Sequence, residues 1–322
     1  MTPIKIHPVK SIQYTPFGGY HPMDLEYLNA NGIEMTKDID AADILLSQNR
    51  KHLKRYFYRY LKKKKYLIWT LEPRFNTSFK SVNKEAFNLV DCHIMNIYTG
   101  DVFVSPLSFT TGIINKQLQP LPDDFTLPNR TLVGLMSYYK GINTPKLMRN
   151  GVDIDLIKVR SAIGLKGHRQ HAMDVFGRGW PEGISKEDSR SGDWGGRKGN
   201  ILEDYYFNLC FENTVAENYV TEKIWDSIEG YCLPVYYGKG SGIYTLFPKD
   251  SFIDYSTLSS PEELFEMIAT IPDKEYVRRM NACIDVYKDI VSKGESFALE
   301  ERKLALDAII KKVKQIVSQT DS

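Results

Sequence analysis

The sequence predicts an α/β protein of two domains followed by a helical C-terminal tail, and three observations support this fold class. The chain has 322 residues, of which 42% are hydrophobic and 25% charged, a composition typical of globular proteins and a length sufficient for about two domains of roughly 150 residues each. Short apolar runs alternate with helix-like segments, as in parallel α/β sheets. Residues 206–237 contain a complete β-α-β pattern. We therefore expect domains at 1–130 and 131–295, and a helix at 296–322 that packs back on the first domain.

The first half contains two compact apolar runs, residues 42–47 and 66–70, each bounded by polar residues. Such runs are typical of buried parallel strands. Residues 51–65 between them have the composition of a helix. Residues 115–129 hold three prolines and two aspartates with little periodicity, which indicates an irregular connector and places the domain boundary just after it.

The second half begins with a predicted strand at 131–137. Residues 169–175 are expected to form a helix, and the glycine-rich, charged residues 181–200 a loop. A strand at 206–211 then leads to a helix that starts near Thr221.

That helix is expected to end at Gly230, and a strand at 233–237 follows it. A right-handed crossover would make this strand parallel to the strand at 206–211. The remainder is predicted to be helical. The expected helices cover 261–270, 273–292 and 296–317.

Composition limits the classes of function. Forty-two Lys and Arg residues against 40 Asp and Glu residues give a net charge of +2, so the overall charge does not predict a nucleic-acid partner. No signal peptide or membrane span is visible, and the four cysteines are widely spaced, as expected of buried reduced thiols. These features favour a cytoplasmic location. They leave the oligomeric state open.

Residues 51–65 are strongly basic, with eight Lys or Arg residues, no acid and four aromatic residues. A solvated helix face is the simplest interpretation. The alternative is peripheral attraction to an anionic membrane or to a phosphorylated glycolipid acceptor, because basic residues near such a surface contribute about 1 kcal/mol each.

The most informative pattern runs through Phe207–Thr214, Tyr219–Ile224 and Leu233–Gly238. It combines an amide, a phenol, a carboxylate and an ammonium group with the start of a helix, where unpaired N–H groups and the helix dipole favour phosphate. These segments closely resemble the signature of the α1,3/α1,4-fucosyltransferases, glycosyltransferase family 10. Weaker similarity occurs around Trp69–Pro73.

The resemblance implies a GT-B fold, in which an acceptor-side domain and a GDP-fucose-binding domain of Rossmann type face each other across a cleft. It implies an inverting transfer of L-fucose from GDP-fucose to a hydroxyl group of a glycan that contains GlcNAc or glucose, most often with α1,3 linkage. No cofactor and no essential metal are expected. Two alternatives stay open: a transferase for another GDP-linked sugar, and a catalytically silent module that binds a sugar nucleotide or glycan.

The resemblance also assigns candidate residues. Glu72, which follows a predicted strand, is the candidate base that takes the proton from the acceptor hydroxyl group. The donor would be held by charges and hydrogen bonds that stabilise the departing diphosphate. The candidates for this role are Arg169, Lys198, Asn213, Tyr219, Glu222 and Lys223.

Two short patterns resemble the Asp-x-Asp metal clamp of other glycosyltransferases, at Asp38 to Asp40 and at Asp153 to Asp155. Such three-residue patterns are common in a chain with this many charges, so we do not expect a metal there. Residues 238–242 are rich in glycine but lack the spacing of a phosphate-binding loop, which favours a turn after a strand.

Overall fold

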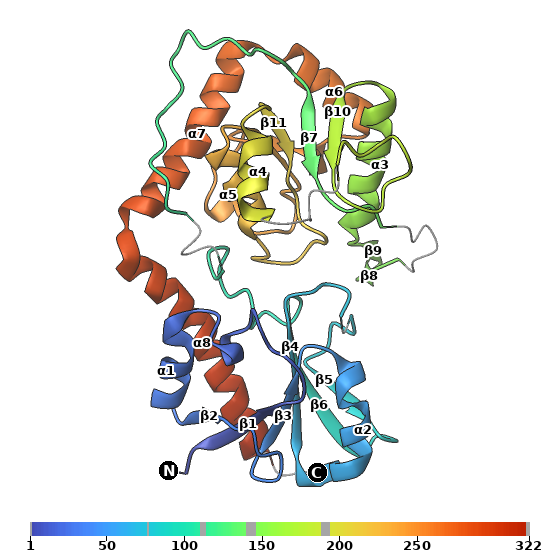
Figure 1. Ribbon diagram of the computed structural model, residues 1–322, viewed down its shortest axis with the longest axis vertical. Coiled ribbons are helices and arrows are strands. Elements are labelled where there is room, and N and C mark those ends of the chain that lie inside the picture. Colours follow the sequence, from blue (N-terminus) through green and yellow to red (C-terminus); the bar gives the residue numbers. More distant parts are fainter. Residues whose placement is uncertain (1, 76, 110–113, 140–145, 188–193, 320–322) are drawn as a thin grey trace. The chain divides into compact units, whose positions relative to one another are not determined.

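The computed structural model describes residues 2–75, 77–109, 114–139, 146–187 and 194–319 (Figure 1). The chain forms two compact units, the first built from Met1–Ser108 and Leu299–Ser322 and the second from Phe109–Ala298. Each unit is an α/β structure on a mainly parallel sheet, and the C-terminal region is helical. The predicted fold class is confirmed in these respects. Within the described residues, no helix combines the length and apolar character needed to cross a bilayer.

The first unit is built on a six-stranded sheet with the strand order β2-β1-β3-β4-β6-β5. All described pairings in it are parallel except that of β5 with β6. The strands are β1 (Ile4–Pro8), β2 (Ile33–Met35), β3 (Ile44–Ser47), β4 (Lys65–Thr70), β5 (Val82–Glu85) and β6 (Val90–Asn96). The helices are η1 (Pro16–Gly18), α1 (Pro22–Ala30), α2 (Arg50–Tyr60), η2 (Leu61–Lys63) and most of α8 (Gly294–Ser318).

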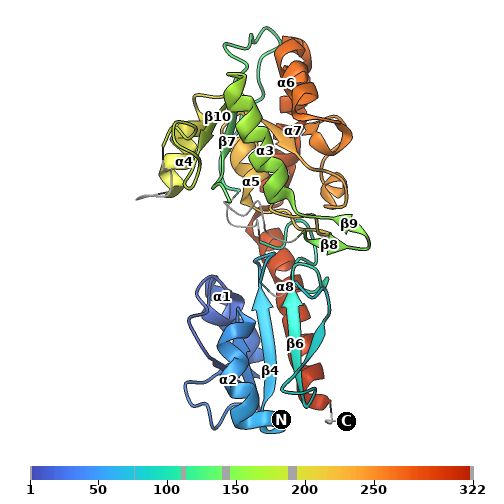
Figure 2. The same ribbon diagram turned by 90° about the vertical axis from the view of Figure 1, so that its right-hand side faces the viewer.

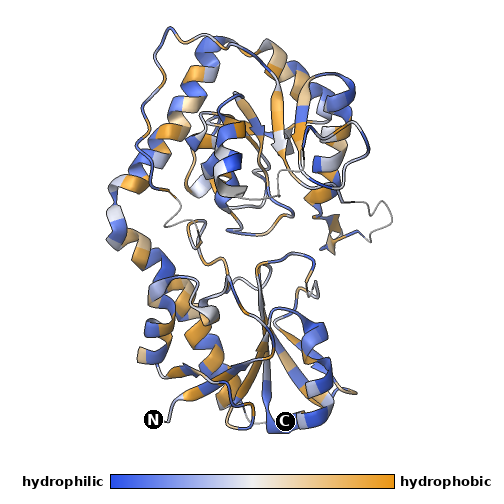
Figure 3. Cartoon of the chain, in the orientation of Figure 1, coloured by the Kyte–Doolittle hydropathy of each residue, from blue (hydrophilic) through white to orange (hydrophobic). Residues whose placement is uncertain are grey.

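Helix α2 forms because an N-cap and an apolar stripe coincide. The side chain of Asn49 accepts a hydrogen bond from the backbone N–H of Lys51 at 3.0 Å. Leu53, Tyr56 and Phe57 are buried, and they pack on one face of the sheet as part of an apolar cluster. The opposite face of α2 is exposed and hydrophilic (Figure 3). The helix predicted for 51–65 is therefore shorter, because β4 begins at Lys65.

Helix α8 packs beside α1 in the first unit (Figures 1 and 2). Arg302 donates two hydrogen bonds of 2.6 Å to the carboxylate of Asp24, and both side chains are buried. The hydroxyl group of Tyr27 donates to Asp307 at 2.9 Å. The apolar stripe of α8 is buried as well; it comprises Ala305, Leu306, Ile309, Ile310, Val313 and Ile316.

The second unit is built on a five-stranded, all-parallel sheet with the strand order β10-β7-β11-β12-β13. The strands of this unit are β7 (Leu132–Leu135), β8 (Met148–Arg149), β9 (Val152–Asp153), β10 (Met173–Phe176), β11 (Phe207–Leu209), β12 (Leu233–Tyr236) and β13 (Ile253–Asp254), with β8 and β9 forming a separate hairpin. The helices are α3 (Leu156–Arg169), α4 (Trp194–Leu202), α5 (Glu222–Glu229), η3 (Ile243–Thr245), η4 (Tyr255–Thr257), α6 (Pro261–Thr270) and α7 (Asp273–Ser292).

The β-α-β unit predicted from the sequence is present as β11, α5 and β12. Phe207 pairs with Leu233 in parallel register. The apolar face of α5 includes Ile224, Trp225 and Ile228, all fully buried, and Gly230 caps its C-terminus. The carboxyl end of β11 and the start of α5 therefore come together at one edge of the sheet.

Two predictions in this half are wrong. Residues 169–175 do not form a helix, because α3 ends at Arg169 and β10 begins at Met173. The segment 181–200 is not a continuous loop, because α4 begins at Trp194; residues 188–193 lie outside the described residues. The apolar positions of α3 are interrupted by glycines at 164 and 167, which pack against Trp180 and Met173 and hide the helical pattern.

The four cysteines are free and buried, as the sequence predicts. Burial raises the pKa of the thiols of Cys92, Cys210, Cys232 and Cys283. Because the thiolate is the reactive form, these side chains behave as packing residues.

Candidate functional site

The centre of the candidate site is the buried carboxylate of Glu212, which follows β11. It accepts hydrogen bonds from the backbone N–H of Thr221 at 2.8 Å and from the Thr221 hydroxyl group at 2.7 Å. Its second oxygen accepts from the ammonium group of Lys223 at 2.8 Å. One carboxylate thus ties the end of the strand to the N-cap and the first turn of α5. The sequence analysis did not single out Glu212 for this role.

Lys223 lies at the centre of these charges. Its ammonium group is 2.8 Å from Glu212 and 3.5 Å from Glu222, and it also donates to the Thr221 hydroxyl group at 2.6 Å. Burial disfavours the charged form, but Glu212, Glu222 and then Tyr219 outweigh it and raise the pKa of Lys223 above its ordinary value. The side chain is therefore a fixed cation at the N-terminus of a helix.

Glu222 is the first residue of α5, and 42% of its side chain is exposed. Partial burial would raise its pKa, but Lys223 and then Lys198 outweigh this effect and lower the pKa to about 2. The carboxylate is ionised near neutral pH and can accept hydrogen bonds from hydroxyl groups of a ligand.

Lys198 of α4 forms a close ion pair with Asp226 of α5. Burial raises the pKa of Asp226, and Lys198 opposes that shift. The pair fixes α4 against α5 and adds a second cation near Glu222. Lys198 is therefore brought to the candidate site, but its ammonium group is already held by a carboxylate.

Asn213 lies next to Arg160, a residue that the sequence analysis missed. The guanidinium group of Arg160 donates to the carbonyl oxygen of Phe211 at 3.1 Å and also to the side-chain oxygen of Asn213. Arg160 is only 9% exposed. The backbone N–H of Leu156, at the start of α3, donates to the carbonyl oxygen of Asn213 at 3.0 Å. The N-terminal half of α3 therefore delivers an arginine to the carboxyl end of β11.

Arg169 does not reach this place. It is the last residue of α3 and is exposed, and its Nε donates to the carbonyl oxygen of Leu165 at 3.2 Å. Arg169 lies nine positions after Arg160 in the helix, which corresponds to about 13 Å along the axis. The structure does not bring Arg169 together with the other donor-binding candidates, whereas Arg160 contacts Asn213.

Tyr219 is 5% exposed and lies close enough to Lys223 to raise its pKa. Its backbone N–H donates to the carbonyl oxygen of Ala216 at 3.2 Å. The turn that carries it includes Asn218 at φ 59°, a left-handed conformation that asparagine tolerates. Asn213, Tyr219, Glu222 and Lys223 are therefore gathered at one edge of the second unit.

Glu72 belongs to the first unit. It comes two residues after β4, where its backbone N–H donates to the hydroxyl oxygen of Thr70 at 3.1 Å and its carbonyl oxygen accepts from Phe75 at 3.2 Å. The side chain is exposed. The carboxylate of Glu72 therefore lies just beyond the carboxyl end of a parallel strand, as the sequence predicts.

The second Asp-x-Asp pattern and the glycine-rich turn take part in hydrogen bonds that involve backbone N–H groups. Asp155 caps α3 by accepting from the N–H of Ile157 at 3.0 Å, and Asp153 accepts from the N–H of Asp155 at 3.1 Å. After β12, the N–H of Gly238 donates to Asp254 at 2.8 Å. A Cβ atom at Gly238 would lie 2.6 Å from that carboxylate and 2.9 Å from the ring of Tyr244, so a larger residue would have to displace these side chains.

Comparison with known proteins identifies the region that contains this edge. Residues 165–280 match the model of the C-terminal part of glycosyltransferase family 10, the fucosyltransferases. The chain carries a family 10 glycosyltransferase domain. This domain includes the β11-α5-β12 unit with Glu212, Asn213 and Lys223.

The chain is also similar to curated proteins. A 4-galactosyl-N-acetylglucosaminide 3-alpha-L-fucosyltransferase of Pongo pygmaeus is 31% identical over 129 residues, covering 38% of this chain and 32% of that protein. A GDP-fucose protein O-fucosyltransferase 3 of Gallus gallus is 42% identical over 78 residues, covering 24% of this chain and 16% of that protein. The chain thus matches about a third or less of the length of these relatives.

Among solved structures, an alpha1,3-fucosyltransferase with GDP-fucose aligns with this chain at a TM-score of 0.42 and 15% identity. The alignment covers 95% of this chain and 90% of that one. A structure of alpha1,3-fucosyltransferase with GDP has a TM-score of 0.46 and 16% identity over 95% of this chain and 91% of that one. The family assignment rests on the sequence match.

Proposed function

We propose that the chain is an inverting glycosyltransferase that moves L-fucose from GDP-fucose to a hydroxyl group of a glycan containing GlcNAc or glucose, with α1,3 as the favoured linkage. The observation that carries the proposal is the family 10 domain, whose β11-α5 edge collects fixed cations beside helix N–H groups. The names of the curated relatives cited above all contain fucose as the transferred sugar, which favours it over other GDP-linked sugars.

The proposed reaction is a direct displacement. The acceptor oxygen forms a bond to the anomeric carbon of fucose while the bond from that carbon to the β-phosphate oxygen breaks. The acceptor proton passes to Glu72 and GDP leaves with the bonding electron pair. A positioned carboxylate of this kind contributes about 10²- to 10⁴-fold to the rate.

Departure of GDP increases the negative charge on its β-phosphate. In the proposed complex, Lys223 and Arg160 supply cationic donors to the diphosphate, and Asn213 and Tyr219 supply hydrogen bonds. Fixed donors of this kind stabilise developing charge because they need no reorganisation during the reaction. Glu222 accepts from hydroxyl groups of the sugar.

The cations are held by carboxylates before a donor binds. Glu212 and Asp226 orient the ammonium groups of Lys223 and Lys198 while limiting the excess positive charge. A diphosphate then binds to oriented ammonium groups, and the partly exposed Lys223 can share its three N–H donors between Glu212 and phosphate.

A hydroxyl group of a protein is a second candidate for the acceptor. The match to a protein named as a GDP-fucose protein O-fucosyltransferase has the higher identity, 42% over 78 residues, although its coverage is shorter. Fucosyl transfer to a hydroxyl group of a protein is therefore a rival to transfer onto an oligosaccharide or glycolipid.

The test is acceptor-dependent release of GDP from GDP-fucose in the presence of EDTA, with N-acetyllactosamine as the first acceptor. We expect release by the native chain and a loss of about 100-fold or more in Glu72→Gln, with unchanged GDP affinity measured by calorimetry. Glu26→Gln, at an exposed acid of α1, is the matched control. It should release GDP at the native rate.

Four results would redirect the proposal. Faster release from GDP-mannose would identify another donor sugar. Loss of GDP affinity in Glu72→Gln would contradict its role as base. Tight GDP binding without release on glycan, glycolipid or protein acceptors would support a silent binding module. Dependence of release on an added divalent metal would contradict the metal-independent reaction.

A further inference from the structure

The first unit carries a surface in which exposed apolar side chains are surrounded by basic ones. The turn between β5 and β6 comprises residues 86–89, and Phe87 within it is 89% exposed. Ala86, Phe87 and Asn88 have φ values of 45°, 60° and 68°. Three consecutive left-handed residues without glycine are strained. The strained turn holds a phenylalanine in solvent.

Three further exposed apolar side chains lie around this turn. Tyr58 of α2 meets Phe87 edge to face, with ring centroids 6.2 Å apart. Leu61 and Leu89 are 41% and 54% exposed and line the same small pocket of about 160 Å³. Solvent-exposed large apolar residues are ordinary when scattered, but a gathered set marks an interaction surface.

Basic side chains surround the apolar set. On α2 the exposed positions include Lys51, Lys54, Arg55 and Arg59. In the part of the chain that the structure describes, the ammonium groups of Lys51 and Lys54 have no carboxylate within 4.0 Å. Arg55 and Arg59 lie over the rings of neighbouring tyrosines of the same helix. Within the described residues, acidic side chains therefore do not neutralise the charges of these four basic residues.

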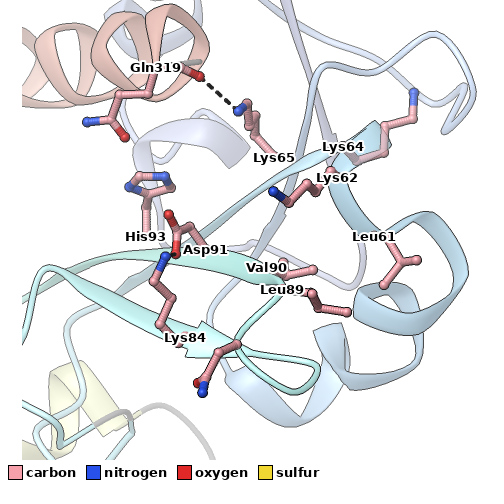
Figure 4. A pocket seen from close by; sticks show the side chains of 11 residues that line it. Leu61, Lys62, Lys64, Lys65, Lys84, Leu89, Val90, Asp91, His93 and Gln319 are labelled. Carbon is pink, nitrogen blue, oxygen red and sulfur yellow. Dashed lines mark hydrogen bonds and ion pairs between the residues drawn. The ribbon is translucent and has the colours of Figure 1, made fainter. Parts of the chain in front are cut away.

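The pocket beside the turn extends the basic surface. Figure 4 shows Lys62 reaching toward it from η2 and Lys84 turning to Asp91 from β5. Lys84 is paired with Asp91 at 2.8 Å. Lys64 donates to the backbone carbonyl oxygens of Asp40 and Ala42, at 2.6 and 2.5 Å. Lys62 and Lys63, again counting only described residues, have no acidic partner.

We propose that this surface, formed by α2, η2 and the β5–β6 turn, docks on an anionic lipid membrane. Phe87, Leu61 and Leu89 would enter the boundary between headgroups and acyl chains, and the lysines of α2 and η2 would contact the headgroups. Aliphatic leucines beside the phenylalanine favour lipid over nucleic acid, because leucine does not stack on bases. The basic residues supply the charge complementarity.

The docked orientation follows from the direction of the strands. β4 begins at Lys65, beside this surface, and runs to Thr70, with Glu72 beyond its other end. The six residues of β4 correspond to about 20 Å. Membrane docking would hold the Glu72 edge of the first unit clear of the headgroups and accessible to an acceptor.

The experiment is sedimentation of the full chain with vesicles of phosphatidylcholine, with and without phosphatidylglycerol. We expect binding only to the anionic vesicles, weakened by added salt. Lys62→Gln and Lys63→Gln should each weaken binding about fivefold. Phe87→Ser should weaken it at least tenfold. Lys274→Gln and Leu304→Ser, at exposed positions outside the surface, should bind as the native chain does.

A spectroscopic readout separates docking from loss of folding. The fluorescence emission of the tryptophan introduced by Phe87→Trp should shift to shorter wavelength on anionic vesicles. The emission of the tryptophan introduced by Leu304→Trp should not shift. The proposal is overturned if anionic vesicles are not bound, if the Lys62, Lys63 and Phe87 variants bind like the controls, or if homopolymeric RNA is retained and vesicles are not.

Discussion

The carboxylate of Glu212, 3% exposed, accepts a hydrogen bond of 2.8 Å from the ammonium group of Lys223 and also closes the N-terminus of α5 through Thr221. The same acid therefore supports the local fold and orients the cation proposed to bind diphosphate. Structure and binding at this edge are linked through one side chain.

We predict that Glu212→Gln lowers the free energy of unfolding by about 2–4 kcal/mol, because it leaves a partly buried ammonium group without its main partner. Urea denaturation measures the loss. Asp289→Asn is the control, since it breaks an exposed ion pair with Lys293 and should cost less than about 0.5 kcal/mol. Equal losses in the two variants would contradict the prediction, as would a double variant with Lys223→Met that recovers no stability.

A second prediction concerns pH. Lys223 and Lys198 overcome the effect of burial and lower the pKa of Glu222 from 4.5 to about 2. The unfolded chain thus binds this proton more readily. The contribution of Glu222 to stability is complete above about pH 4.5 and is lost as the pH falls toward 2. Because the side chain is 42% exposed, we expect at most about 1 kcal/mol.

Glu222→Gln should flatten the dependence of unfolding free energy on pH in that interval. Glu275→Gln is the matched control, because hydrogen bonds from Arg278 and Arg279 outweigh burial and lower the pKa of Glu275 also to about 2. Both variants should flatten the curve, but only Glu222→Gln should weaken binding of GDP-fucose. A weaker affinity in both would indicate an indirect effect.

The third prediction separates two arginines of α3. Arg160→Lys should reduce acceptor-dependent GDP release about 100-fold or more, because a lysine cannot maintain both hydrogen bonds of the guanidinium group, to Phe211 and Asn213, while also contacting phosphate. Arg169→Lys should stay within about twofold of the native rate. Initial rates at saturating acceptor measure both. A larger loss of GDP release in Arg169→Lys than in Arg160→Lys would indicate that Arg169 contacts the donor.

The fourth prediction compares neighbours on α8. Arg302 is buried against Asp24, whereas Lys303 makes an exposed pair with Glu300. Arg302→Met should lower the free energy of unfolding by about 3–5 kcal/mol because it leaves a buried carboxylate unpaired. Lys303→Met should change it by less than about 0.5 kcal/mol. Urea denaturation followed by fluorescence distinguishes them, and similar midpoints would argue against a stabilising contact between α8 and α1.

The elements that were predicted well carry strong local signals. α6 and α7 begin at Pro261 and Asp273, as expected from the preceding Ser260 and Pro272. The β11-α5-β12 unit combines buried strands with an apolar helix face. By contrast, α3 was missed because Gly164 and Gly167 lie where aromatic and methionine side chains from other elements fill the space. Such packing depends on tertiary structure.

The candidate site was predictable where its residues lie close together in sequence. Asn213, Tyr219, Glu222 and Lys223 come from one strand-loop-helix segment, and the structure gathers them. Arg160 lies more than fifty residues earlier and reaches Asn213 only because α3 begins beside β11. The family resemblance pointed instead to Arg169, the last residue of α3. Glu212 was hidden because its role depends on burial.

Because Arg302 and the apolar stripe of α8 belong to the first unit, the strands of that unit cannot complete their core until α8 has been synthesised. The second unit, Phe109–Ala298, has all its strands available sooner. We therefore expect this chain to depart from the usual order of co-translational folding, in which the N-terminal domain matures first. The sheet of the first unit stays incompletely covered until α8 has left the ribosome.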